Sequence, residues 1–307
     1  MDFLWSLKEM RTPFFDTFFS LITQLGEEMI LIAIFSILFW CVNKRMAYVL
    51  GSSFFISSLI VQGAKPLFRV PRPWVYDPTF APVGSSIDPA TGLATGGSVG
   101  TATGYAFPSG HTQNGTALFG SLGAQIKNKI VKVVAFTLVA LIAFSRLYLG
   151  VHYISDVVVA LIISVGAILF ALKFITEESE SLKRELLVPG IIALLAIAAI
   201  IVVAVLYIGE VTTYAQLRDT IIPAGAGLGF AIGMFVERNY IKFSTKAQNL
   251  PIQFLKLVLG FAVVMGILEG GRIFGANLFG DGLRYFLAVI WLTIVFPLII
   301  KKFFTKK

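Results

Sequence analysis

The chain has 307 residues, of which 57% are hydrophobic and only 14% are charged. So few polar residues could hardly cover a water-soluble protein, and the composition predicts an integral membrane protein. The net charge of +8 does not require a nucleic-acid partner, because basic cytoplasmic loops that face anionic lipid account for most of it.

The first 25 residues predict a short helix in the membrane interface. Arg11 and Asp16 stand among the apolar residues and no small-residue cleavage site follows, so a secretory signal peptide is not expected. Thr12 followed by Pro13 is typical of an N-cap and a first helical residue. Residues 1–25 are therefore predicted to form an N-terminal interfacial helix.

Apolar runs of about 20 residues, the length that crosses a bilayer, follow from residue 26 almost to the end of the chain. They predict an all-α fold, a polytopic transmembrane helical bundle of about nine spans. The approximate limits of these spans are 26–43, 46–64, 110–126, 130–149, 152–174, 186–208, 219–237, 252–271 and 283–301. The third span is short and rich in glycine, which makes it the weakest of the set.

The distribution of lysine and arginine predicts the side of the membrane that each end of the chain occupies. With nine spans, 16 of the 25 basic residues fall in the connections on one side, and this richer side is expected to be cytoplasmic. The N-terminus would then lie outside and the C-terminus inside. The chain would be a multi-pass protein of the cell membrane.

Three polar stretches interrupt the apolar pattern. They are KPLFRVPRP at 65–73, YAFPSGHTQ at 105–113 and SRLYLGVHYISD at 145–156. The predicted topology places all three at the outer face, where segments far apart in the sequence can form one pocket. The two histidines of the chain, His111 and His152, both lie in these stretches, which favours a chemical role for them over packing alone.

His152 and Asp156 stand four residues apart at the start of the predicted fifth span, a spacing that places two side chains on one helix face. A carboxylate there can accept the proton of one imidazole nitrogen, fix the tautomer and leave the other nitrogen as a nucleophile or a base. The alternative is a buried pair that only satisfies its own hydrogen bond.

Basic residues outnumber acidic ones at this predicted pocket. Arg146 near membrane depth needs an anion, and Asp156 alone could serve. Lys65 and Arg72 reach the same pocket, however, so three cations would share one carboxylate. This surplus predicts an anionic ligand, and phosphate fits best because its oxygens match guanidinium forks.

The PSGH sequence supplies the remaining parts of a phosphate site. Ser109 can cap the helix that follows, so that the amides of Gly110 and His111 lie at its positive N-terminus. His111 is the only other residue in the chain whose ordinary pKa suits protonation of a leaving oxygen. The carboxylates near the outer pocket are few and not clustered as Mg²⁺ requires, so neither a metal nor another cofactor is expected.

These stretches resemble the type-2 phosphatidic acid phosphatase superfamily. Its motifs are Lys-x6-Arg-Pro, Pro-Ser-Gly-His and Ser-Arg-x5-His-x3-Asp, and every fixed position is filled here in the right order. The positions are Lys65, Arg72 and Pro73, then Pro108, Ser109, Gly110 and His111, then Ser145, Arg146, His152 and Asp156. The resemblance covers roughly residues 26–175.

The resemblance implies a metal-independent membrane phosphatase that acts through a phosphohistidine. It implies that His152 attacks phosphorus, that Asp156 orients His152, and that His111 protonates the leaving group. The residues implied to bind phosphate are Lys65, Arg72, Ser109, Gly110 and Arg146. Residues 26–175 would be the phosphatase core and 176–307 a four-span extension without a motif, a layout that looks like the sphingosine-phosphate and glucose-6-phosphatase branches.

A site at the lipid–water boundary favours a lipid phosphate monoester or diphosphate as substrate, since the hydrocarbon chains can stay in the bilayer. Two alternatives remain open. One is a phosphotransferase that uses the same intermediate with an alcohol as acceptor, and the other is a phospholipid or phosphate transporter that retains the pocket for binding.

Two further features each allow two interpretations. The Gly/Ser/Thr-rich loop at 77–104 is either a flexible connector or a lid over the pocket. A run of small residues permits close helix contact, either within the bundle or in a homodimer. Its glycines are Gly225, Gly227, Gly229 and Gly233.

Overall fold

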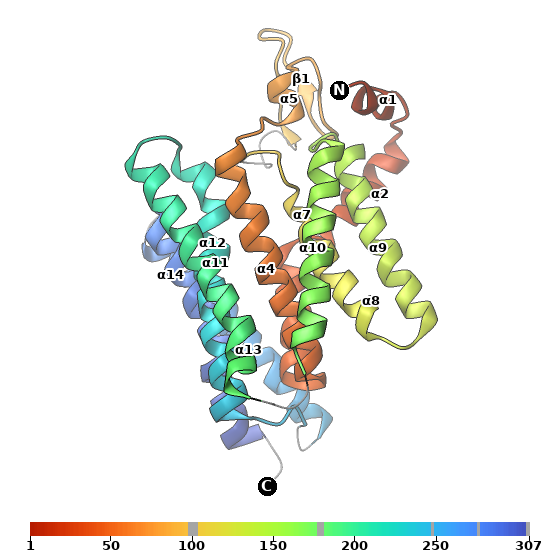
Figure 1. Cartoon of the computed structure of the whole chain (residues 1–307). Helices are drawn as coiled ribbons and strands as arrows, with labels where there is room; N and C mark the ends of the chain where they lie inside the picture. The colour runs from red at the N-terminus through yellow and green to blue at the C-terminus, as the bar shows by residue number, and fades with distance from the viewer. Residues whose placement is uncertain (98–103, 177–180, 247–248, 275–276, 305–307) are drawn as a thin grey trace. The chain divides into compact units, whose positions relative to one another are not determined.

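The computed structural model describes residues 1–97, 104–176, 181–246, 249–274 and 277–304 (Figure 1). Regular structure in these residues is almost entirely helical, as predicted. The α-helices are α1 Asp2–Glu9, α2 Pro13–Gln24, α3 Glu28–Ile37, α4 Lys44–Phe68, α5 Pro73–Tyr76, α7 Gly110–Gly115, α8 Ser121–Gln125, α9 Lys129–Tyr148, α10 Ile154–Phe174, α11 Leu182–Ile208, α12 Tyr214–Val236, α13 Leu250–Gly270, α14 Leu278–Ile290 and α15 Phe296–Ile299. The π-helical turns are η1 Leu38–Val42, η2 Thr116–Gly120, η3 Glu237–Ile241, η5 Trp291–Val295 and η6 Ile300–Phe304, and η4 Gly271–Phe274 is a 3₁₀ turn.

Seven helical segments in the described residues are long and apolar enough to cross a membrane, and the bent pair α2 and α3 raises this number to eight. The third predicted span, 110–126, forms the continuous run of α7, η2 and α8, which ends at Gln125. At 1.5 Å per residue this run is about 24 Å long, against about 30 Å of bilayer hydrocarbon. The chain is thus a multi-pass helical protein with seven or eight candidate spans, and the count of nine stays a prediction.

The chain folds into two compact units. The first contains Met1–Ile30 and Ile60–Gly166, and the second contains Leu31–Leu59 and Ala167–Lys307. All residues of the predicted site belong to the first unit. The division into residues 1–25, 26–175 and 176–307 remains a prediction.

The N-terminal segment of the first unit forms two helices rather than one. Thr12 caps α2 as predicted, since its Oγ1 accepts the Phe15 N–H at 3.3 Å and Pro13 is the first helical residue. Arg11, between α1 and α2, donates from Nη1 to the Ala81 carbonyl at 2.9 Å and from Nη2 to the Tyr148 carbonyl at 3.1 Å. The segment is therefore tied to the rest of the unit by hydrogen bonds.

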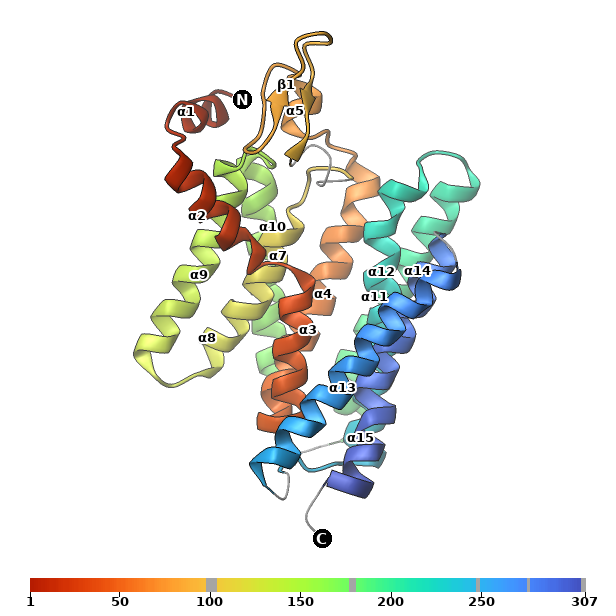
Figure 2. The same cartoon turned by 180° about the vertical axis from the view of Figure 1, so that it is seen from behind.

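Helix α9 is the central packing partner of the first unit. Figure 2 shows α2, α7 and α8 beside it. Phe19 of α2 packs on Tyr148 of α9 with ring centroids 4.5 Å apart, in a buried cluster that includes Trp74 and Val151. The Tyr148 hydroxyl also donates to Asp16 at 2.8 Å, which fixes the angle of α2 against α9.

Gly150 makes the tight turn between α9 and α10. Its φ angle is +77°, and a Cβ atom there would lie 2.7 Å from Arg11 Nη2 and 2.7 Å from the Phe80 ring. Both the backbone conformation and the lack of space require glycine. The turn brings Arg146, in the last turn of α9, and Asp156, in the first turn of α10, to the same end of the unit.

The connection after α5 contains a short antiparallel hairpin at the end of the first unit that also carries α1 (Figure 1). Strand β1 (Ser86–Ile87) pairs with β2 (Ala94–Thr95). Residues 98–103 of the predicted connector or lid lie outside the described residues. The choice between these two interpretations stays open.

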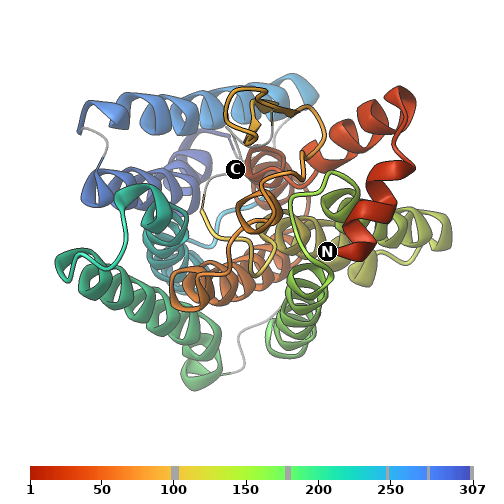
Figure 3. The same ribbon diagram turned by 90° about the horizontal axis from the view of Figure 1, so that it is seen from above.

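In the second unit, α12 packs between α11 and α14 (Figure 3). A Cβ atom on Gly225 would collide with the Gly282 carbonyl, one on Gly229 would lie 2.9 Å from the Phe286 carbonyl, and one on Gly233 would collide with Thr293. These glycines therefore allow the close approach of α12 to α14 and to the following turn η5. The interpretation of the small residues as packing within the bundle is confirmed, and a homodimer stays untested.

Acidic side chains are buried in the second unit together with cations. Asp281, in the first turn of α14, lies 2.5 Å from Arg284 Nη2 and 3.1 Å from Arg218 Nε, and it also accepts from the Tyr214 hydroxyl at 2.5 Å. Such clusters neutralise charge inside an apolar bundle. These ionic residues of the second unit therefore have a structural role.

Candidate active site

His152 and Asp156 form a buried pair with a defined tautomer. His152 is 2% exposed and Asp156 is fully buried. The Asp156 Oδ2 atom lies 3.3 Å from His152 Nδ1 and accepts the Tyr153 N–H at 2.9 Å. A carboxylate can only accept, so Nδ1 carries the imidazole proton and Nε2 keeps the lone pair.

The position of His152 differs from the prediction in one respect. His152 lies in the turn before α10, not inside the helix, and α10 begins at Ile154. Asp156 is the third helical residue and folds back on the turn, as the acidic member of a capping box does. The two side chains therefore meet through the helix start and not through one helix face.

Arg72 lies directly beside the unprotonated nitrogen of His152. Its Nη1 atom is 3.0 Å from His152 Nε2, and the same atom donates to the Val151 carbonyl at 2.9 Å. Its Nε donates to the Gly104 carbonyl at 3.2 Å, which holds the guanidinium from a second side. Arg72 is thus fixed where it would touch any group bonded to Nε2.

The PSGH segment docks on the same pair. The Ser109 N–H donates to the Asp156 main-chain oxygen at 3.1 Å, and the Ser109 hydroxyl caps α7 through the Thr112 N–H, as predicted. A Cβ atom on Gly110 would lie 2.9 Å from Gln62 Nε2 and 3.8 Å from Lys65 Nζ. The first two motifs therefore meet at Gly110, with the Lys65 ammonium close to its backbone.

Arg146 is only 6% exposed, and the carboxylate whose charge acts on it among the described residues is that of Glu27, with no direct ion pair between them. Its Nη1 donates to Thr23 Oγ1 at 2.5 Å, and its buried Nε has no hydrogen-bond partner in the described part of the chain. Asp156, the one carboxylate that the sequence offered as a possible partner of Arg146, makes no hydrogen bond or ion pair with it within the residues that the structure describes. The carboxylate of Asp156 is occupied by Tyr153 and His152, together with the Ser155 hydroxyl.

His111 has a partner, Glu27, that the sequence did not indicate. Its Nε2 lies 3.0 Å from the Glu27 Oε1 atom, and its side chain is 30% exposed. Glu27 lies in the break between α2 and α3, next to Gly26, whose carbonyl accepts from Asn114 at 3.0 Å. The only signal in the sequence was a charged pair, Glu27 and Glu28, at the start of an apolar run.

The cations of the site favour the neutral form of His152. Burial lowers the pKa of His152 well below its ordinary value, and the positive charges of Arg72 and Arg146 lower it further. His152 lies outside the membrane-spanning segments, in the turn between α9 and α10. At neutral pH its Nε2 atom therefore keeps a lone pair, and this atom lies 3.0 Å from Arg72 Nη1.

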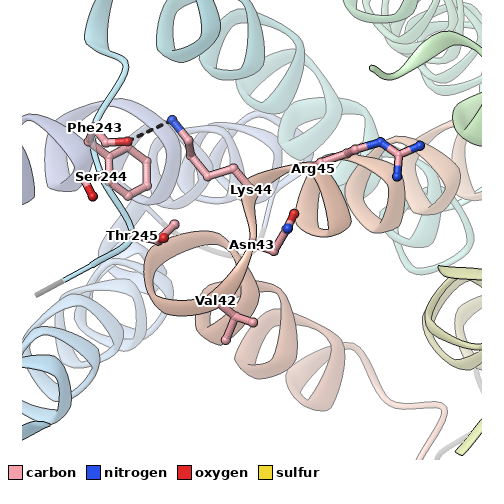
Figure 4. A pocket seen from close by; sticks show the side chains of 7 residues that line it. All are labelled: Val42, Asn43, Lys44, Arg45, Phe243, Ser244 and Thr245. Atoms are coloured by element: carbon pink, nitrogen blue, oxygen red, sulfur yellow. Dashed lines mark hydrogen bonds between the residues drawn. The ribbon is translucent and has the colours of Figure 1, made fainter. Parts of the chain in front are cut away.

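A pocket of about 350 Å³ in the second unit is unrelated to these residues (Figure 4). Its wall is formed by Val42, Asn43, Lys44, Arg45, Phe243, Ser244 and Thr245. Lys44 donates to the Phe243 carbonyl at 2.9 Å and to Glu237 at 2.8 Å, so its charge is already paired. Among the described residues there is also no group of three or more His, Cys, Asp or Glu side chains arranged to hold a metal ion.

Comparison with known families agrees with the motifs. The family model described as PAP2 superfamily matches residues 45–180, and the one described as PAP2 superfamily phosphatase, transmembrane extension, matches residues 221–307. No curated protein and no solved structure matches the chain. The first match contains all three motifs, and the two matches together cover most of the sequence. The chain belongs to the type-2 phosphatidic acid phosphatase (PAP2) superfamily.

Proposed function

We propose that this protein is a metal-independent membrane phosphatase that hydrolyses a lipid phosphate monoester or diphosphate through a phosphohistidine intermediate. The observation that carries the proposal is the geometry of His152. Asp156 accepts the proton of Nδ1, and Arg72 stands 3.0 Å from the unprotonated Nε2. This geometry supports a nucleophile, an orienting carboxylate and a phosphate-binding cation at one site.

In the first step, the lone pair of His152 Nε2 forms a bond to phosphorus. The bond from phosphorus to the leaving oxygen breaks, and its electron pair stays on that oxygen, which takes a proton from His111. The ring of His152 becomes cationic, and the Asp156 carboxylate stabilises it through Nδ1–H.

In the second step, water attacks the phosphohistidine. His111, now neutral, takes a proton from this water, and the electron pair of the phosphorus–nitrogen bond returns to Nε2. Inorganic phosphate leaves, and His111 is again protonated while His152 is again neutral.

Positive charge is expected to hold the phosphoryl group throughout. Arg72, Arg146 and Lys65 all lie close enough for their charge to act on His152. The buried Nε atom of Arg146 without a partner offers a donor to an anion, and the backbone of Gly110 leaves room beside Lys65. Ser109 positions this backbone through its cap and its bond to Asp156.

We place the site at the outer face of the cell membrane, with the N-terminus outside and the C-terminus in the cytoplasm. The contact of Arg72 with His152 supports this topology. Arg72 follows α4 and His152 follows α9, so both helices end at the same side of the first unit. The chain between them must therefore cross to the opposite side before α9 begins. The run from Gly110 to Gln125 is the segment available for that crossing, and a short span is tolerated by local bilayer thinning. With the bent pair and the seven long helices it makes nine spans.

The proposal is tested by phosphate release from the purified protein. The substrate panel contains phosphatidic acid, phosphatidylglycerol phosphate, a polyprenyl diphosphate, a sphingoid-base phosphate and glucose 6-phosphate. We expect turnover of a lipid substrate, an acid-labile phosphoenzyme, and loss of both in His152→Ala. Preference for glucose 6-phosphate would defeat the lipid assignment, and a phosphorylated alcohol in place of free phosphate would identify a transferase. Phosphate transport that persists in His152→Ala, without phosphate release by the unmodified protein, would identify a transporter.

A further inference from the structure

The contact between Glu27 and His111 joins two segments that lie 84 residues apart in the sequence. Glu27 Oε1 is 3.0 Å from His111 Nε2, and within the described residues this contact is the side-chain hydrogen bond of His111. The backbone around Glu27 is docked on α7, since Asn114 donates to the Gly26 carbonyl at 3.0 Å and a Cβ atom on Gly26 would lie 3.0 Å from the His111 carbonyl. The pair is therefore held by the fold and not only by two flexible side chains.

Burial of the His111 ring and the positive charges around it disfavour the protonated form, and Glu27 favours it. Arg146 of α9 and Lys65 of α4 act on the ring with positive charge, and Glu27, from the break between α2 and α3, supplies the negative charge. A general acid must carry a proton before the reaction begins. Glu27 is therefore the group that opposes loss of the proton that the leaving oxygen needs.

We propose that Glu27 is a positioning residue for the general acid, whose carboxylate holds the protonated His111 ring through Nε2 and leaves Nδ1 for the leaving oxygen. This inference rests on the proposed function, in which His111 is the acid. Protonated imidazole carries a hydrogen on each nitrogen, so Nε2–H can donate to Glu27 while Nδ1–H is transferred. The Glu27 side chain is 55% exposed, so water can return a proton to the pair after each turnover.

The first test compares substrates that differ in their need for an acid. The leaving group of an alkyl phosphate is a strongly basic alkoxide, whereas the leaving group of p-nitrophenyl phosphate is a stabilised phenolate that needs no proton. In Glu27→Gln we expect kcat/KM for the alkyl phosphate to fall about 10- to 100-fold and kcat/KM for p-nitrophenyl phosphate to change less than about threefold. Since kcat/KM covers the steps up to the phosphoenzyme, the comparison isolates the departure of the leaving group.

The second test follows the pH dependence of the alkyl reaction. Glu27→Gln removes the countercharge of the protonated ring, so the alkaline limb of kcat/KM should move to lower pH. Glu27→Asp keeps the charge and should restore part of the rate and of the pH range. Glu28→Gln, which removes the neighbouring carboxylate, is the matched control and should behave like the unmodified protein.

A double-mutant comparison completes the test. In a His111→Ala background, Glu27→Gln should have almost no further effect, because the residue through which it acts is gone. Equal losses on both substrates, an unmoved alkaline limb or full additivity with His111→Ala would each overturn the role of Glu27. Failure of the unmodified protein to form a phosphoenzyme on His152 would overturn the proposed function instead, so the two failures are distinguishable.

Discussion

Asp156→Asn should lower kcat/KM about 10²- to 10³-fold while the fold is retained. In the structure, Asp156 Oδ2 lies 3.3 Å from His152 Nδ1 and 2.9 Å from the Tyr153 nitrogen. The asparagine oxygen can still accept from Tyr153 and keep the start of α10 capped. The amide lacks the charge that fixes the Nδ1–H tautomer and that would stabilise the cationic ring of the proposed phosphohistidine.

The magnitude follows from the contacts of the pair. A hydrogen bond to a charged group contributes about 1.5 to 3 kcal/mol, which corresponds to roughly 10- to 150-fold in rate. The positive charges of Arg72, Arg146 and Lys65 act on the same ring and disfavour the additional positive charge that phosphorylation creates. Loss of the carboxylate leaves this repulsion unbalanced, so we expect the effect at or above the upper end of that range.

The measurement is phosphate release together with the amount of phosphoenzyme trapped by acid, in variants purified in the same detergent. Asp281→Asn is the matched control, because Asp281 is also buried, lies in the first turn of α14 and pairs with an arginine, but belongs to the second unit. It should lower the melting temperature and leave kcat/KM nearly unchanged. If Asp156→Asn retained kcat/KM within threefold of the unmodified protein, the orienting role of Asp156 would be refuted.

Three further outcomes are expected. Burial and the positive charges of Arg72 and Arg146 lower the pKa of His152, so this side chain should stay neutral as the pH falls. After correction for the ionisation of the substrate phosphate, kcat/KM should therefore decline only well below pH 6.5. An acid limb at or above 6.5 would contradict the assignment of His152. Gly110→Ala places a methyl group 2.9 Å from Gln62 Nε2 in the proposed phosphate site and should lower kcat/KM by at least tenfold. Gly190→Ala, in a helix with open space around it, should not, and equal rates in both variants would remove Gly110 from the site. Finally, excess EDTA should leave activity intact and vanadate should inhibit it as a mimic of pentacoordinate phosphorus, whereas a loss in EDTA that Mg²⁺ restores would refute a metal-independent reaction.

The features that the sequence predicted well depend on short-range patterns. The long helices follow from apolar runs, the cap of α2 from Thr12 and Pro13, and the cap of α7 from Ser109. Each depends on residues within a few positions of one another, so its physical cause is visible in the sequence. The juxtaposition of Arg72 with His152 followed from a further step, namely the alternation of spans across the membrane.

The features that were missed depend on contacts between distant segments. Arg146 donates to Thr23 and not to Asp156, and His111 pairs with Glu27. Both partners lie near the end of α2 or just after it, a region that the sequence identified only as an interfacial helix and the beginning of a span. No periodicity or motif in residues 23–27 indicates which helix they contact, because that depends on how α2 packs on α9.

The four-residue spacing of His152 and Asp156 has a different physical basis from the one that the sequence suggested. On one helix face the pair would depend on two side-chain rotamers and would tolerate small shifts of the backbone. In the structure Asp156 is the third residue of α10, and the same Oδ2 atom that reaches His152 accepts the backbone N–H of Tyr153 at 2.9 Å. The carboxylate is therefore fixed by the backbone at the helix start, and the Ser109 N–H bonded to the Asp156 carbonyl adds a second restraint. The proposed orientation of His152 and the capping of α10 use the same atom, so the start of α10 and the tautomer of His152 depend on one another.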